Sequence, residues 1–158
     1  MSDAEPEFVT SNPDPDHPGW NDWVIRDPDS YNGFLGKMIV RRGGDDVGDD
    51  IARVRMFPER RHRNLGDVVH GGTMMGFIDC ALFAAMRVLD LGPSGPAVTM
   101  ELQTHFIGAA NMDEHLEAQV EIARATRRFL FMRGLVVQEE GSNVASFTAI
   151  VKKGQASK

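Results

Sequence analysis

The chain has one cysteine, Cys80, among its 158 residues, and its histidines show no spacing typical of metal ligands. A single cysteine cannot form an internal disulfide, and a zinc site needs several closely spaced cysteine or histidine ligands. A surplus of positive charge is missing too, since 17 Lys and Arg stand against 23 Asp and Glu. Structural disulfides and metal sites are therefore excluded, and neither nucleic acid nor an anionic membrane is an expected partner.

Long hydrophobic runs are also absent. The longest, residues 74–86, has 13 residues and contains Asp79, whereas a membrane-spanning helix needs about 20 apolar residues. This run is predicted to be a buried helix. Residues 1–8 are acidic and lack the basic and apolar parts of a secretion signal, so a cytoplasmic location is expected.

Length and composition, with 42% hydrophobic residues, predict one globular domain with an extension at each end. Residues 1–33 are rich in Pro, Asp and Asn and are expected to form a partly disordered N-terminal extension, mobile at least through residue 17. Within it, Trp20 and Trp23 are expected to dock onto the domain and cover the edge of its core, in preference to forming a lid over a site. Residues 34–152 form the domain, and residues 153–158 form a C-terminal tail.

Alternating apolar residues predict about six antiparallel strands, at residues 34–41, 51–57, 97–107, 116–125, 129–138 and 144–152. Residues 72–90 are apolar on nearly every side and predict one long helix that must be enclosed. A sheet with one apolar face can bury the side chains of such a helix by curving around it. The expected class is therefore α+β, an antiparallel sheet wrapped around a central helix. Its open edge and uncovered flank invite a second copy of the chain.

A histidine and two glycines, His70, Gly71 and Gly72, stand at the start of the predicted helix. The first N–H groups of a helix have no partner within it and lie at the positive end of its dipole, so they can stabilise an oxyanion. A glycine there lets a carbonyl group approach without a Cβ in the way. Ordinary turn chemistry also places glycine before a helix, so the tripeptide alone leaves both interpretations open.

Asp79 is the only charged residue between Gly72 and Met86. An unpaired carboxylate removed from water is costly, so a charge at this position requires a reason. It is either a structural aspartate, held by backbone N–H groups or by an arginine across an interface, or a catalytic carboxylate aimed at a cleft.

Asn64, Gly66, His70, Gly71, Gly72 and Asp79 occur in the spacing N-x-G-x3-H-G-G-x6-D, with Thr99 following at the start of a strand. Over about residues 34–152, this pattern resembles hotdog-fold acyl-CoA thioesterases of the phenylacetate-degradation (PaaI-like) type. The resemblance implies a helix wrapped by an antiparallel sheet, in agreement with the elements above. It also implies hydrolysis of a small or medium acyl-CoA thioester, aromatic acyl groups included, with coenzyme A as part of the substrate and no separate cofactor.

The resemblance assigns roles to individual residues. The Gly71 N–H would polarise the thioester carbonyl with His70 beside it, while Asp79 would activate or orient the attacking water, or attack directly. Asn64 would help to position the water or the thioester, and Thr99 would hold the nucleophile side of the site. In the family the aspartate acts across a dimer interface, which implies a homodimer with interfacial sites, with a tetramer also open.

Three features of this pattern have competing interpretations. Strict alternation points Thr99 away from Asp79 unless the strand begins with a twist or bulge. Arg127 and Arg128 lie in a predicted turn, where they either bind coenzyme A phosphates or are solvated turn residues. Several helix side chains either line an acyl pocket or form simple core: Met74, Met75, Phe77, Leu82 and Met86.

The remaining histidines, His17, His62, His105 and His115, are expected on the surface. Two other functions stay open beside hydrolysis. One is a non-catalytic acyl-CoA or lipid-binding hotdog protein, such as a ligand sensor, and the other is hydration or dehydration of an acyl-CoA. The sequence identifies neither the acyl group nor whether the thiol partner is coenzyme A or a carrier protein.

Overall fold

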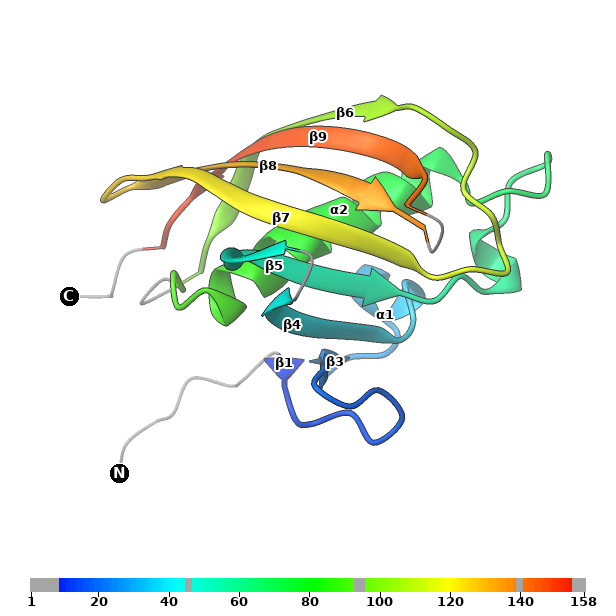
Figure 1. Cartoon of the computed structure of the whole chain (residues 1–158), viewed down its shortest axis with the longest axis horizontal. Coiled ribbons are helices and arrows are strands. Elements are labelled where there is room, and N and C mark those ends of the chain that lie inside the picture. The colour runs from blue at the N-terminus through cyan, green and yellow to red at the C-terminus, as the bar shows by residue number, and fades with distance from the viewer. Residues whose placement is uncertain (1–8, 45–46, 93–95, 139–140, 155–158) are drawn as a thin grey trace.

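The computed structural model of the chain describes residues 9–44, 47–92, 96–138 and 141–154. The first eight residues of the predicted N-terminal extension, the last four of the predicted tail, and Asp45 and Asp46 between the first two predicted strands lie outside the described residues. The described parts form one long helix and a seven-stranded antiparallel sheet (Figure 1), which confirms the predicted architecture.

The strands of the large sheet follow the order β2-β4-β5-β7-β8-β9-β6. Their bounds are β2 Asn21–Asp22, β4 Met38–Gly44, β5 Val47–Met56, β7 Leu116–Ala125, β8 Phe129–Val137, β9 Asn143–Lys152 and β6 Val98–Phe106. Outside this sheet lie β1 Val9–Thr10 paired with β3 Val24–Ile25, the short helix α1 Tyr31–Phe34 and the 3₁₀ turn η1 Arg60–His62.

The first predicted strand is wrong at its start. Phe34 ends α1, and β4 begins only at Met38. Ser30 accounts for the difference, because its hydroxyl accepts a hydrogen bond from the N–H of Gly33 at 3.2 Å and so caps a helical turn. The two-residue strand β2, which the alternation also missed, is too short to leave a pattern.

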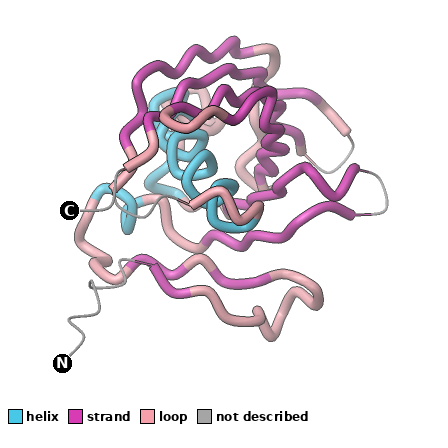
Figure 2. Tube along the Cα trace, turned by 90° about the vertical axis from the view of Figure 1, so that its left-hand side faces the viewer, coloured by secondary structure: helices cyan, strands magenta, loops and turns pink. Residues whose placement is uncertain are grey.

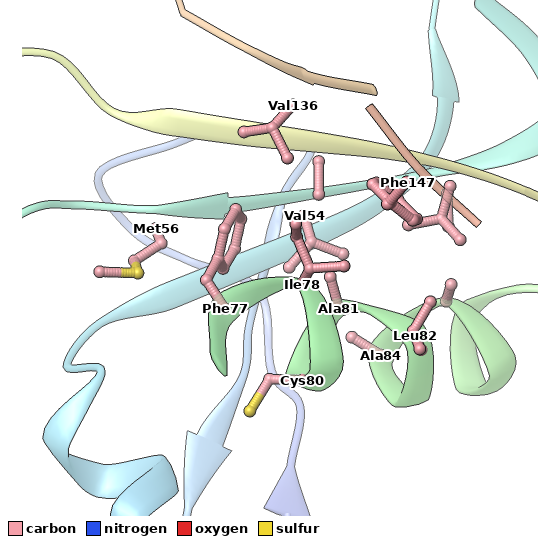
Figure 3. Packing of buried hydrophobic residues seen from close by; sticks show 14 of the residues in the cluster. Val54, Met56, Phe77, Ile78, Cys80, Ala81, Leu82, Ala84, Val136 and Phe147 are labelled. Carbon is pink, nitrogen blue, oxygen red and sulfur yellow. The ribbon is translucent and has the colours of Figure 1, made fainter. Parts of the chain in front are cut away.

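The long helix α2, Gly71–Val88, lies in the hollow of the curved sheet (Figure 2). Phe77, Ile78 and Ala81 point from α2 toward the strands, where Val54 and Val136 lie (Figure 3). Although α2 is long and apolar enough to cross a membrane by length and composition, 10 of its 18 residues are buried within the protein. It is therefore the core helix that the sequence predicted.

One stripe of α2 is not covered by the sheet. Its members are exposed or half-buried and recur every three or four positions, which places them on one helix face: Gly72, Met75, Gly76, Asp79, Phe83 and Arg87. Strand β6, at the end of the sheet order, is similarly open, since Val98, Met100 and Phe106 are 56%, 58% and 56% exposed. The predicted open edge and uncovered flank are both present.

The N-terminal segment packs against the domain. Trp23 joins the hydrophobic core, and Trp20 is also buried. Trp20 is packed by three guanidinium groups whose central carbons lie 4.2 to 5.5 Å from its ring centroid, those of Arg41, Arg53 and Arg55. The predicted docking of both tryptophans is confirmed.

A buried charged cluster lies on the face of the sheet opposite α2. The Glu117 carboxylate accepts hydrogen bonds from Arg53 Nε at 2.8 Å, Arg55 Nε at 2.7 Å and Gln119 Nε2 at 3.1 Å. Burial by itself would raise the pKa of Glu117, but these hydrogen bonds outweigh it, so the pKa lies below its ordinary value of 4.5. The cluster borders a cavity of about 450 Å³.

Candidate active site

The helix α2 begins at a histidine cap. His70 has extended backbone angles, and its Nδ1 accepts a hydrogen bond from the N–H of Gly72 at 2.9 Å. Since Nδ1 accepts, the proton of the neutral ring is on Nε2. Gly71 is then the first helical residue, and its N–H finds no acceptor among the described residues. The Gly71 N–H is thus a free donor at the positive end of the helix.

Asn64 shapes the loop that leads to this cap. Its side-chain oxygen accepts hydrogen bonds from the N–H groups of Gly66 at 2.8 Å and Val68 at 3.3 Å. In addition, Asp67 adopts a left-handed conformation with φ of 59°. Within one chain, Asn64 therefore orders the backbone that precedes His70.

Phe106, at the end of β6, flanks the start of α2. Its Cζ lies 3.4 Å from the position that a Cβ on Gly71 would take. The sequence placed Phe106 on a strand but gave no sign that the strand ends over this turn. Phe106 is 56% exposed beside this turn.

Thr99 holds Asp79. The Thr99 hydroxyl donates to Oδ1 of Asp79 at 2.7 Å. The required bulge is present, because the pairing of β6 with β9 shifts between Thr99 and Glu101. In the part of the chain that the structure describes, no backbone group and no arginine binds the Asp79 carboxylate, and Oδ2 has no hydrogen-bond partner.

Gly71 and Asp79 lie on the same helix but far apart. Eight residues separate them, which corresponds to about 12 Å along an α-helix. The oxyanion donor and the carboxylate of one chain therefore do not meet at one carbonyl. They could meet only if the α2 helix of a second chain lay alongside, with the Gly71 N–H of one chain near the Asp79 carboxylate of the other.

Residues 66–145, half of the chain, match the family model of the thioesterase superfamily. The chain belongs to the thioesterase superfamily. It is a thioester hydrolase with the hotdog fold, and the predicted resemblance to PaaI-like thioesterases is confirmed. The TT0310 protein from Thermus thermophilus is 27% identical with a TM-score of 0.64, over 82% of this chain and 100% of that chain.

A mutant of the phenylacetic acid degradation protein PaaI from the same organism is 26% identical with a TM-score of 0.63, over 81% of this thioesterase and 100% of that chain. A hypothetical thioesterase from Streptococcus pneumoniae, solved with coenzyme A, shares the fold at 19% identity and a TM-score of 0.64, over 78% and 94% of the two chains. No curated protein matches this thioesterase in sequence.

Arg127 and Arg128 of this thioesterase are exposed in the turn between β7 and β8. The strand register aligns Val98 with Lys152 and Lys152 with Phe129, so this turn lies at the end of the sheet where β6 begins. The Arg128 carbonyl also accepts a hydrogen bond from the N–H of Lys153 at 2.8 Å. Two arginines and two lysines thus gather at the end of the sheet that carries Thr99.

The methionine-rich face of α2 is mostly core. Four of the five residues considered for an acyl pocket are at most 3% exposed: Met74, Phe77, Leu82 and Met86. Met75 alone is exposed and lies in the stripe with Asp79. Cys80 is no nucleophile, since burial, together with the Asp79 charge, raises its pKa to about 12 and keeps the thiol protonated.

The prediction that His62 is a surface residue is wrong, because its side chain is fully buried. His62 Nδ1 accepts from the N–H of Glu59 at 2.8 Å, so Nε2 carries the proton and donates to the Phe34 carbonyl at 2.8 Å. The His62 carbonyl accepts from the N–H of His70, also at 2.8 Å. His62 therefore connects α1 to the cap of α2. It lies in a polar loop without periodicity, so no pattern indicated its burial.

The other three histidines agree with the expectation, since His105 is exposed and His17 and His115 are half-buried. Within the described ranges, no group of three or more His, Cys, Asp or Glu side chains is placed to hold a metal ion.

Proposed function

We propose that this thioesterase hydrolyses acyl-CoA thioesters with small or medium acyl groups, aromatic ones included, by attack of a water molecule. The observation that supports this most directly is the state of Asp79. Its Oδ1 is fixed by Thr99, while Oδ2 has no partner among the described residues and lies on the uncovered stripe of α2. A carboxylate with one oriented oxygen and one free oxygen is suited to hold a water molecule and accept its proton.

The reaction requires a polarised carbonyl and a positioned water. The thioester oxygen would bind at the Gly71 N–H, where the hydrogen bond strengthens as negative charge develops on that oxygen in the transition state. The dipole of α2 acts in the same direction. Asp79 would take the proton of the attacking water. The leaving thiol has an ordinary pKa of about 8.5, so its departure as thiolate needs little help from an acid.

The complete site is proposed to form between two chains of a homodimer, alone or as half of a tetramer. The thioester would bind at Gly71 of one subunit and meet Asp79 of the partner subunit. The separation of about 12 Å along one helix supports this arrangement, as do the uncovered stripe of α2 and the exposed apolar side chains of edge strand β6. The cavities of about 450 and 360 Å³ in one chain include neither Gly71 nor Asp79.

Arg127 and Arg128 are proposed to bind the phosphates of coenzyme A. Both arginines are exposed, and the neighbouring Lys152 and Lys153 add positive charge at the same end of the sheet. A protein of the same fold has been solved with coenzyme A. Exchange of both arginines for alanine should raise KM for an acyl-CoA with little effect on kcat. It should not alter hydrolysis of an acyl-pantetheine, which lacks the nucleotide phosphates.

Thiol release from a panel of short, medium, long and aromatic acyl-CoAs tests the proposed activity. We expect turnover of at least one small or medium substrate. Asp79→Asn should keep the fold and lower kcat by at least about 100-fold, the usual contribution of a general base. An acyl-CoA that raises the melting temperature without thiol release would instead support a non-catalytic binding protein. Turnover of acyl carrier protein thioesters alone would refute coenzyme A as the thiol partner.

A further inference from the structure

A large aromatic side chain from the N-terminal segment lies against the catalytic helix. Tyr31 of α1 is 59% exposed, yet its ring contacts α2 at Gly76. A Cβ at Gly76 would collide with the phenol oxygen of Tyr31 and would lie 2.9 Å from its Cε1. The phenol hydroxyl also donates to the Gly72 carbonyl at 3.5 Å, which is the long limit of a hydrogen bond.

The contact lies within the proposed site. Gly76 has no side chain, and the Tyr31 ring fills the notch that this leaves on the uncovered stripe. Gly72, whose carbonyl accepts the hydrogen bond from the phenol, lies one helical turn before it. Asp79 is the next stripe residue along the helix, three positions after Gly76. Tyr31 therefore lies between the start of α2 and Asp79, on the face where the substrate is expected.

The ring is held in place from behind. Its centroid lies 6.1 Å from that of Phe34 in a stacked arrangement, and Phe34 packs edge-on against His62 at 5.2 Å. His62 is fully buried and hydrogen-bonded to the backbone on both sides, so this support is rigid. A side chain more than half exposed but supported in this way has a surface available to a ligand.

We propose that Tyr31 is a specificity-determining residue of the thioester site, whose ring forms a wall that limits the size of the acyl group placed at the Gly71 N–H. This inference rests on the proposed function. The ring carries the effect, because the hydroxyl points at the backbone of α2 and makes only one long hydrogen bond there. Phe106 is a second aromatic side chain beside Gly71, 3.4 Å from the position that a Cβ there would take.

Three variants distinguish the effect of the Tyr31 ring from that of its hydroxyl and from a general loss of stability. Tyr31→Phe keeps the wall. Tyr31→Ala removes it, and Gly76→Ala displaces the ring by filling the notch while improving the helix propensity of α2. Phe131→Ala is the matched control, because Phe131 is also an exposed aromatic residue but belongs to β8, where its neighbours Leu130 and Met132 are the core-facing residues.

The measurement is kcat/KM for acetyl-, butyryl-, hexanoyl- and decanoyl-CoA. We expect Tyr31→Ala and Gly76→Ala to raise the ratio of decanoyl to acetyl turnover by at least about tenfold, as removal of a pocket wall does in enzymes that select by size. Tyr31→Phe and Phe131→Ala should keep the wild-type ratio. An unchanged ratio in both Tyr31→Ala and Gly76→Ala, with turnover retained, would overturn the inference and leave the proposed function intact.

A second measurement does not depend on hydrolysis. Calorimetric binding of S-(2-oxopropyl)-CoA and S-(2-oxoundecyl)-CoA, thioethers that keep a carbonyl group but cannot be hydrolysed, should show the same change of preference in Tyr31→Ala. If that change occurs while no acyl-CoA is hydrolysed, the wall is supported and the proposed activity fails. If neither thioether binds to the wild-type protein, the wall is refuted together with the proposed substrate class.

Discussion

The hydroxyl of Thr99 on the edge strand β6 donates to Oδ1 of Asp79 on α2 across 2.7 Å. If this bond orients the carboxylate toward water, Thr99→Val should lower kcat by about 100-fold, the lower limit for the loss of a well-placed catalytic contact. Thr99→Ser restores the donor and should recover most of the activity. Steady-state kinetics of both variants give the answer, and a wild-type kcat for Thr99→Val would show that the hydrogen bond has no catalytic role.

The contact between Thr99 and Asp79 could not be predicted from the alternation of the sequence. The alternation of residues 97–107 predicted the strand, and strict alternation turned Thr99 away from Asp79. The register shift observed between Thr99 and Glu101 breaks the alternation there, and the Thr99 side chain faces Asp79. A bulge depends on the pairing of two strands, and a periodic pattern in one strand does not record it.

Complementation between inactive subunits tests the interfacial site. Asp79→Asn removes the carboxylate, and Gly71→Val places a branched side chain where the carbonyl should approach. Each variant alone should be inactive. Co-refolded in equal amounts, they form mixed dimers in which one of the two sites is intact, so about a quarter of wild-type activity should return. If mixed dimers are shown to form but have no activity, the Gly71 N–H and the Asp79 carboxylate act within the same chain.

The ion pairs of buried Glu117 with Arg53 and Arg55 should make the fold sensitive to acid. Since the pKa of Glu117 is lowered in the folded protein, its contribution to stability is present above the ordinary pKa of 4.5 and is lost as the pH falls through the folded-state value. Glu117→Gln should reduce the free energy of unfolding at pH 7 by about 3 kcal/mol, the lower end of the cost of removing one partner from a buried ion pair. Urea unfolding should show this difference shrinking below about pH 4.5, whereas a constant difference across the range would contradict the ionic interpretation.

Gly134 on β8 should tolerate no side chain. A Cβ there would overlap the carbonyl oxygen of Gln119 and lie 2.9 Å from Cε1 of the buried Phe147. Gly134→Ala is therefore expected to cost about 2 kcal/mol of folding free energy through overpacking. Gly92→Ala, at a position with nothing within 4 Å of the added Cβ, is the control and should be near neutral. Equal unfolding midpoints for the two variants would contradict the steric argument.

Cys80 should be inert in the folded protein. Its pKa of about 12 and its burial leave almost no thiolate at pH 8. A thiol reagent such as a disulfide dye should label one cysteine at once in urea but label the native protein only as slowly as it unfolds. Rapid stoichiometric labelling without denaturant would show that the thiol is accessible.

The strands and the helix were predictable because burial on one face imposes a period on the sequence, as in residues 116–125, where the predicted and observed bounds of β7 coincide. Asp79 was recognisable as a candidate because it is a lone charge in an apolar helix, whereas His70 and Gly71 became candidates only through the spacing of the whole pattern from Asn64 to Asp79. Tyr31 and His62 were not recognisable, because their positions depend on contacts between loops. Neither the contact of Tyr31 with Gly76 nor the burial of His62 produces a periodic pattern in the sequence.

The packing of the N-terminal segment has a practical consequence for work on this enzyme. Strand β2 hydrogen-bonds to β4, and Trp23 is part of the hydrophobic core. A version of the protein that begins at residue 34 would therefore expose the edge of β4 and leave a cavity in the hydrophobic core. Exposed strand edges tend to pair with other chains. Expression of a chain that begins at residue 34 is thus expected to give insoluble material, and the N-terminal extension should be kept.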